Sequence, residues 1–275
     1  MHVDIGDARL FVHEHGAGEP IVMVPPGPGL DGSVFFPWFH RLKGYRLLGV
    51  DLPGHGRSDR GVPERWTVSD WASDLTRLAD ALALEGFTLL GHSFGARVAL
   101  QHAVDFPGRA TRVICSGGIA HRGALAHMED TFESWGTPEL RARVDAAFEA
   151  EDVVETPADC HAAWMGQMPF LLAEAGGPAA VAIDQGWRSA RYSPEIHRHG
   201  SFGDFDVRLS LPEVAVPALV VTGRDDRITR PQESEEIAGL LPQSTLAIIE
   251  GAGHFPFVER PNDYFTVLEQ WLART

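Results

Sequence analysis

Short apolar runs alternate with turn clusters and helical patterns along the first third of the chain. The runs at 10–15 (LFVHEH), 20–24 (PIVMV) and 45–50 (YRLLGV) are typical of strands. Between Thr67 and Leu84 the apolar residues recur at three- and four-residue spacing. This spacing predicts a helix with one buried face.

The same alternation continues over the next thirty residues. A strand is predicted at 87–90 (FTLL), and a helix from about 96 to 105, which ends before Pro107 because the residue ahead of a proline disfavours helical geometry. The apolar run at 112–118 (RVICSGG) predicts the next strand.

After this strand the pattern changes. From about Ala120 to Ser210 the chain is helix-like and irregular, and it is rich in tryptophan, methionine and phenylalanine. The regular alternation then resumes with a strand within 217–226 (PALVVTGRDD), a helix at about 232–241, a strand at 245–250 (TLAIIE) and a closing helix at 262–272.

Apolar strands separated by helices indicate an α/β protein, in which a mostly parallel sheet is covered by helices on both faces. We expect residues 1–119 and 211–275 to form this α/β core. Residues 120–210 are expected to be a helical insertion, because a structureless loop of that length would be unusual in a compact domain.

Composition and charge exclude several classes of function. The 275 residues carry 23 lysines and arginines against 38 acidic residues, a net charge of −15. This charge argues against a nucleic acid partner and against docking to a membrane of anionic lipids. Lys43 is the only lysine, and its setting (RLKGY) suits neither Schiff-base chemistry nor a phosphate-binding loop.

Location and assembly are only weakly indicated by the sequence. No apolar run reaches the ~18 residues that a membrane span needs, and the first residues lack the basic and then apolar order of a signal peptide. Cys115 and Cys160 are expected to be reduced. These features predict a cytoplasmic protein that acts on a small molecule, and they leave a homodimer open.

The segment with the clearest chemistry is FTLLGHSFGARVAL. A buried strand here runs directly into a helix through Gly91, His92, Ser93, Phe94 and Gly95, which forces a tight turn. Such a turn holds its central serine in a strained conformation at the carboxyl edge of the sheet, and glycines are needed on both sides to avoid collisions. Ser93 is therefore the predicted nucleophile.

A serine hydroxyl is a weak nucleophile and requires a base. His254 lies in the loop GAGHFPF, between the last strand and the last helix, from which an imidazole can reach the predicted turn. The base in turn needs a carboxylate, and the strand end PALVVTGRDD offers Asp225 and Asp226. We favour Asp226, and Asp225 remains the alternative. The chain order is then Ser93, Asp226, His254.

Attack on a carbonyl group creates an oxyanion that needs N–H donors. One donor is expected from Phe94, which follows the nucleophile, and a second from the loop PPGPG after an early strand. Prolines have no N–H group, so Gly27 and Gly29 are the donors in this loop, of which Gly27 is preferred.

The remaining histidines indicate no metal site. The pairs His13/His15 and His197/His199 lack a third ligand at metal spacing, and we expect solvated side chains there. No cofactor and no metal ion are predicted.

The segments PPGPG, DLPGHGRSD, GHSFG, GRDDRI and GAGHFPFVERP occur in this order over the whole chain outside the insertion. In this respect the chain resembles the α/β-hydrolase fold family, and its PPGPG loop is most similar to that of proline iminopeptidases. The resemblance implies a catalytic triad of Ser93, Asp226 and His254, an oxyanion hole from the amides of Gly27 and Phe94, and a helical cap formed by the insertion.

Three functions follow as hypotheses. The first is a serine hydrolase that cleaves an ester, lactone or amide bond of a small, largely apolar substrate through an acyl-enzyme on Ser93. The second is a proline iminopeptidase-like aminopeptidase that releases N-terminal proline. The third is a ligand-binding protein of the same fold with weak catalysis.

Overall fold

One mixed sheet forms the centre of the molecule. The computed structural model describes residues 1–202 and 204–275, and within them eight strands pair in the order β1-β2-β4-β3-β5-β6-β7-β8. β1 and β2 are antiparallel to their neighbours, whereas the strands from β4 to β8 run parallel. The strands are β1 (His2–Asp4), β2 (Arg9–Gly16), β3 (Glu19–Val24), β4 (Tyr45–Val50), β5 (Thr88–His92), β6 (Arg112–Ser116), β7 (Ala218–Gly223) and β8 (Ser244–Ile249).

The central strands are buried because helices cover both faces of the sheet. All residues of β5 and β7 are buried, as expected for parallel strands inside an α/β core. The predicted α/β fold with a mostly parallel sheet is therefore confirmed. The sequence did not predict β1 or the antiparallel pairing of β2 with β4.

The helices of the core divide into two layers. One layer, α2, α3 and α9, packs with residues such as Val24 and Val50 into the first of two hydrophobic clusters. The other layer, α1 and α11, packs with residues such as Met23 and Leu47 into the second. These helices are α1 (Phe36–Phe39), α2 (Val68–Ala81), α3 (Phe94–Asp105), α9 (Pro231–Leu240) and α11 (Pro261–Leu272), and the short α10 (Pro256–Glu259) precedes α11.

The start of α2 shows how the sequence sets these helices. Thr67 has extended backbone geometry, and its hydroxyl accepts a hydrogen bond from the backbone N–H of Asp70. This capping satisfies one of the free N–H groups at the helix start. The spacing of Trp71, Leu75 and Leu78 then gives the helix a single buried face, as predicted.

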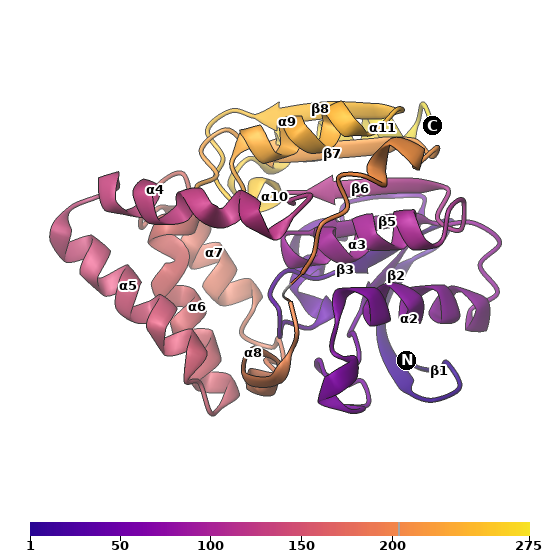
Figure 1. Cartoon of the computed structure of the whole chain (residues 1–275), viewed down its shortest axis with the longest axis horizontal. Helices are drawn as coiled ribbons and strands as arrows, with labels where there is room; N and C mark the ends of the chain where they lie inside the picture. The colour runs from indigo at the N-terminus through magenta and orange to yellow at the C-terminus, as the bar shows by residue number, and fades with distance from the viewer. Residues whose placement is uncertain (203) are drawn as a thin grey trace.

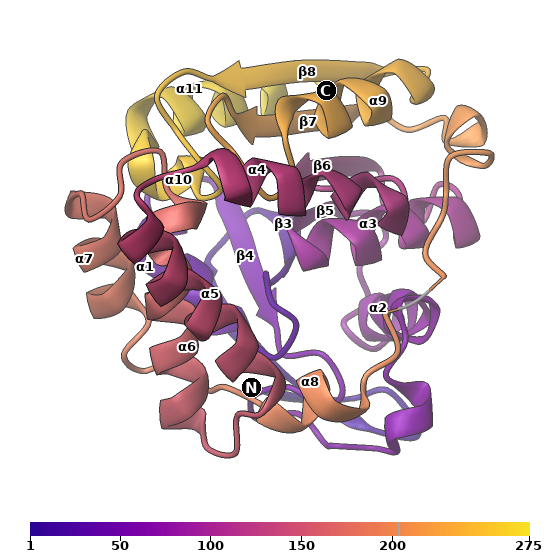
Figure 2. The same cartoon turned by 60° about the vertical axis from the view of Figure 1, so that its left-hand side comes forward.

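The segment between β6 and β7 is mainly helical. The helices α4 to α8 gather at one end of the molecule, beyond the carboxyl ends of the central strands (Figures 1 and 2). The exact division of the chain at residues 120 and 210 stays a prediction. This segment contains η3 (Arg122–His127), α4 (Met128–Ser134), α5 (Pro138–Asp152), α6 (Pro157–Leu171), α7 (Pro178–Gly186), α8 (Pro194–His199) and η4 (Leu211–Glu213).

None of the helices that the structure describes combines the length and the apolar composition that are needed to cross a bilayer.

Replacing Leu78 with alanine tests the packing of α2. Leu78 is 0% exposed, so Leu78→Ala is expected to lower the free energy of unfolding by about 2–5 kcal/mol through lost burial and the cavity left behind. Leu209→Ala is the matched control, because Leu209 is 95% exposed and its truncation should change stability by less than about 0.5 kcal/mol. Urea unfolding of both variants measures the difference, and equal effects would contradict this account.

Candidate active site

The chain makes its sharpest turn at Ser93, between β5 and α3. Ser93 has a φ of 54°, a left-handed value that non-glycine residues rarely adopt. Its backbone N–H donates to the carbonyl oxygen of Ser116 on the neighbouring strand, at 2.9 Å. The predicted strained turn is therefore present, and it places the Ser93 side chain at the carboxyl edge of the sheet.

Two glycines permit this turn. A Cβ atom on Gly91 would collide with the carbonyl oxygen of Gly95, and one on Gly95 would collide with that of Val24 in β3. Both obstacles are backbone atoms, which cannot rotate away as a side chain could. The glycines thus allow β5, α3 and the end of β3 to approach one another closely.

The three predicted side chains meet above this turn. His254 Nε2 lies 2.9 Å from Ser93 Oγ, and His254 Nδ1 lies 2.8 Å from Asp226 Oδ2. Both distances are those of hydrogen bonds. The side chains of His254 and Asp226 are almost fully buried, so water does not compete for these contacts. A proton can pass along this line from the hydroxyl to the imidazole.

Neighbouring donors hold the carboxylate of Asp226 in place. Its Oδ1 accepts hydrogen bonds from the backbone N–H groups of Ile228 and Thr229, and its Oδ2 accepts one from the Thr229 hydroxyl. Asp225, the alternative from the sequence, is exposed and lies outside this cluster. The geometry thus brings Asp226, and not Asp225, to His254.

Glu259 organises the loop that carries His254. Its Oε1 accepts hydrogen bonds from the backbone N–H groups of Gly253 and Phe255, on either side of the histidine, and its Oε2 accepts one from Ala173 in the insertion. Burial raises the pKa of Glu259, and the three backbone donors oppose this rise. One buried carboxylate thus ties the histidine loop to the end of α6.

The same end of α6 is held by two further contacts. The backbone N–H of His254 donates to the carbonyl oxygen of Leu171 at 2.7 Å, and the Arg227 guanidinium donates to those of Phe170 and Leu172. Arg227 follows Asp226 directly. Residues 170–173 are therefore bonded to both loops that supply the histidine and the aspartate.

The loop after β3 brings Gly27 to the same edge of the sheet. Gly27 has a φ of 134°, which favours glycine. The loop is attached to the insertion, because Ser193 N–H donates to the carbonyl oxygen of Gly29 and Arg191 N–H donates to Asp31. The N–H group of Phe94 stands at the start of α3, where a helix has no internal acceptor for it.

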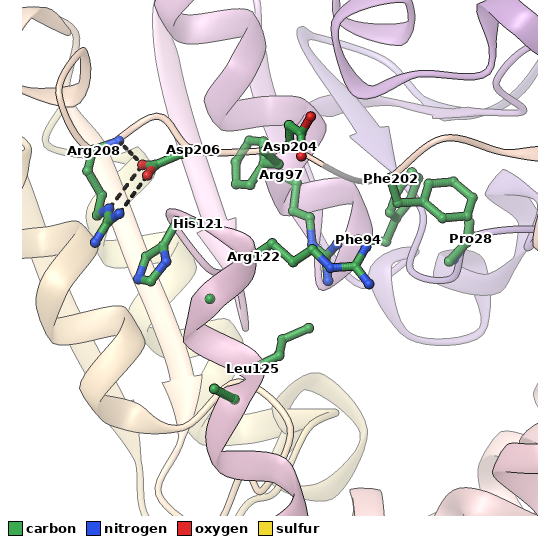
Figure 3. Close-up of a pocket in the computed structure, with 13 residues that line it drawn as sticks. Pro28, Phe94, Arg97, His121, Arg122, Leu125, Phe202, Asp204, Asp206 and Arg208 are labelled. Carbon is green, nitrogen blue, oxygen red and sulfur yellow. Dashed lines mark hydrogen bonds and ion pairs between the residues drawn. The ribbon is translucent and has the colours of Figure 1, made fainter.

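A pocket of about 940 Å³ opens beside this turn. Phe94 and Pro28, which adjoin Ser93 and Gly27, lie at one end of it (Figure 3). Phe202 and Leu125 add apolar surface from the insertion, whereas other parts of the lining carry charged side chains. The lining therefore combines apolar and charged side chains.

His92, inside the turn, is fully buried next to the site. Its Nδ1 lies 3.0 Å from the carbonyl oxygen of Ser116, and its ring lies 5.1 Å from that of His254. Burial lowers the pKa of His92 well below its usual value, and the charge of His254 adds to this effect. His92 therefore remains neutral beside the triad.

The prediction of solvated histidines was right for His15 and His199, which are exposed, and wrong for their partners. His197 is mostly buried, with Nδ1 3.5 Å from a Glu151 carboxylate oxygen. The physical reason is the carboxylate that each buried histidine meets in the fold, which sequence spacing does not reveal.

His13 meets two carboxylates. Its Nε2 lies 2.9 Å from Asp51 and 4.0 Å from Asp31. The three side chains could surround a metal ion by distance alone. However, Asp51 already accepts backbone hydrogen bonds from Gly32 and Arg57, so the cluster is accounted for as a link between β2 and the loops after β3 and β4.

Sequence reasoning missed Thr229, Glu259 and Arg227. Thr229 acts through Asp226. Arg227 and Glu259 act through backbone groups, among them those of residues 170–173 in the insertion. The only sequence signal was proximity, because Arg227 and Thr229 follow Asp226 closely and Glu259 stands five residues after His254.

Comparison with known proteins identifies the family to which the chain is related. A family model of the alpha/beta hydrolase fold matches residues 19–261. A proline iminopeptidase of Lactobacillus helveticus is 26% identical, with 95% of this chain and 92% of that protein covered. A 2-hydroxy-6-oxo-2,4-heptadienoate hydrolase of Pseudomonas putida is also 26% identical, with 98% and 94% covered.

Solved structures show the same fold. A thermophilic esterase from Thermogutta terrifontis superposes with a TM-score of 0.76 at 26% identity, over 100% of this chain and 98% of that one. A proline iminopeptidase of Mycobacterium smegmatis gives a TM-score of 0.78 at 20% identity, over 100% and 97%. With the family model covering most of its length, the chain belongs to the α/β-hydrolase fold family.

Proposed function

We propose that this enzyme is a serine hydrolase that cleaves an ester, lactone or amide bond of a small substrate through an acyl-enzyme on Ser93. The observation that carries the proposal is the continuous line of hydrogen bonds from Ser93 Oγ through His254 to Asp226. Membership of the α/β-hydrolase family supports a hydrolase that acts on esters or amides.

The mechanism follows from the positions of these groups. His254 Nε2 accepts the proton of Ser93 as the hydroxyl oxygen attacks the carbonyl carbon, and Asp226 stabilises the imidazolium that forms. The N–H groups of Gly27 and Phe94 donate to the oxyanion. The imidazolium then protonates the leaving group, and a water molecule activated by His254 releases the acid from Ser93.

A proline iminopeptidase-like activity is the second candidate, and the Lactobacillus helveticus relative favours it. Recognition of a free ammonium group would need an unpaired carboxylate in the pocket. Three acidic residues of the insertion are candidates for this role: Glu133 and Glu149 are exposed, and Asp184 binds His161 and Arg188. None of the three lines the pocket, whereas Asp204 does, in a lining that carries three arginines against two aspartates. This excess of positive charge disfavours binding of an ammonium group and favours the first candidate.

Replacing Ser93 with alanine tests the proposed nucleophile. Turnover of p-nitrophenyl butyrate is expected to fall by about 10⁴-fold or more, because no acyl-enzyme can form. A fluorophosphonate probe should label the wild type once per chain and leave the variant unlabelled. Retention of most activity in Ser93→Ala would mean that another group attacks the substrate. Parallel assays with proline p-nitroanilide distinguish the two candidate functions, because faster hydrolysis of the anilide would favour the aminopeptidase.

Paired substitutions of the adjacent aspartates test the proposed acid. Asp226→Asn removes the charge that stabilises the imidazolium and should lower kcat by roughly 10³- to 10⁴-fold. Asp225→Asn, in the same loop with an exposed side chain, should remain within about threefold of wild type. Steady-state kinetics of both variants give the comparison, and a larger loss in Asp225→Asn would reverse the assignment.

Glu259→Gln tests whether this carboxylate positions His254. The new amide group would point a donor at a backbone N–H, so we expect stability to fall by about 1–3 kcal/mol. A displaced imidazole should also lower kcat by about tenfold while KM changes little. Glu250→Gln is the control, since Glu250 pairs with Arg224 on the surface. Wild-type kcat in Glu259→Gln would show that the loop holds its position without the carboxylate.

A further inference from the structure

Two arginines reach into the pocket from opposite elements. Arg97 lies on α3 and Arg122 at the start of η3, and both line the pocket. Figure 3 shows their side chains extending toward each other and ending beside Phe94. Like charges repel, so this arrangement requires a compensating group or carries an electrostatic cost.

The compensating group is missing from the described part of the chain. Within residues 1–202 and 204–275, neither guanidinium forms an ion pair or a hydrogen bond with a protein group. Asp204 lines the same pocket without pairing with either arginine. By contrast, Arg208 on the same pocket wall is paired with Asp206 at 2.6 Å.

The pKa of Arg97 reflects its burial and its position beside a second positive charge. Arg97 is partly buried, and its burial, followed by the positive charge of Arg122, lowers its pKa to about 10. The side chain is thus charged at neutral pH but poorly solvated. A buried charge is normally paired, so an anion bound between the two guanidinium groups would supply what the protein does not.

The arginines also stand close to the reacting atoms. Arg97 lies in the first turn of α3, the helix that begins directly after Ser93. Phe94, whose N–H is a proposed oxyanion donor, lines the same pocket, and both guanidinium groups end beside it (Figure 3). An anionic group held between them would therefore lie on the side of the pocket that adjoins the proposed oxyanion hole.

We propose that Arg97 and Arg122 form a carboxylate-binding subsite, so that the substrates of this enzyme are esters or amides whose acyl part carries a carboxylate group at its far end. A planar carboxylate matches the fork of a guanidinium and can accept from two of them at once. This inference rests on the proposed serine-hydrolase function and names its substrate class. A free ammonium substrate would be repelled at the same place.

The test compares two esters of matched shape. One is the mono-p-nitrophenyl ester of glutaric acid, and the other is p-nitrophenyl 5-methylhexanoate, in which an isopropyl group replaces the carboxylate. The wild type should hydrolyse the charged ester with a kcat/KM at least about tenfold higher. Arg97→Met, which keeps the apolar stem, and Arg122→Gln should each lower this selectivity ratio by about 10- to 100-fold.

Arg208→Met is the matched control. Arg208 also lines the pocket, but its positive charge is already paired with Asp206. Its selectivity ratio should remain within about threefold of wild type. A ratio near one in the wild type, or an equal loss in Arg208→Met, would overturn the subsite and leave the proposed hydrolase function intact.

A binding measurement distinguishes failure of the proposed subsite from failure of the proposed hydrolase function. If the enzyme hydrolyses neither ester and the fluorophosphonate probe leaves Ser93 unlabelled, the proposed function fails. Calorimetric titration of glutarate into the wild type and both arginine variants then tests the subsite alone. Binding at least tenfold weaker in the variants supports the subsite, and equal or absent binding in all three proteins overturns it.

Discussion

The close approach of three backbone segments at Ser93 is the constraint on which the site depends. Gly91 and Gly95 leave room for carbonyl groups where a Cβ atom would stand, and this contact locks β5 and α3 around the turn. The left-handed backbone at Ser93 costs on the order of 1–3 kcal/mol, and the surrounding packing offsets it. The result is a hydroxyl and the first free N–H of a helix that face the same small volume.

The insertion contributes to the alignment of the triad as well as to the pocket. Residues 170–173 accept or donate hydrogen bonds to Arg227, His254 and Glu259, so the two loops that carry the acid and the base share one support. Bonds that involve a charged group contribute roughly 1.5–3 kcal/mol each. Movement of this segment would therefore shift both loops together and keep the distance between Asp226 and His254 nearly constant.

The sequence predicted that Ser93, Asp226 and His254 meet, because parallel topology gathers the carboxyl ends of strands at one edge. Ser93, Asp226 and His254 each follow such an end, so their chain order and their positions were enough to bring them together. The sequence did not predict the roles of Glu259 or Arg227, because their partners are backbone groups within 170–173 and beside His254, and the sequence does not show which backbone groups meet in the fold. The sequence also did not predict the contact between His13 and a carboxylate, because its partner Asp51 stands 38 residues away in the chain.

The charge of the whole chain makes the two unpaired arginines informative. Acidic residues outnumber lysines and arginines by 38 to 23, so carboxylates are abundant on this protein. Arg208 and His121, in the lining of the same pocket, have acidic partners in Asp206 and Glu236. Arg97 and Arg122 have none among the described residues, although an acidic partner would offset the desolvation of Arg97. Surface charges act over a Debye length of about 8 Å at physiological salt, so the negative charge of the chain scarcely opposes an anion that has entered the pocket. Inside it, the partly buried Arg97 and the exposed Arg122 provide the local field, and the proposed carboxylate of the substrate would complete the pairing.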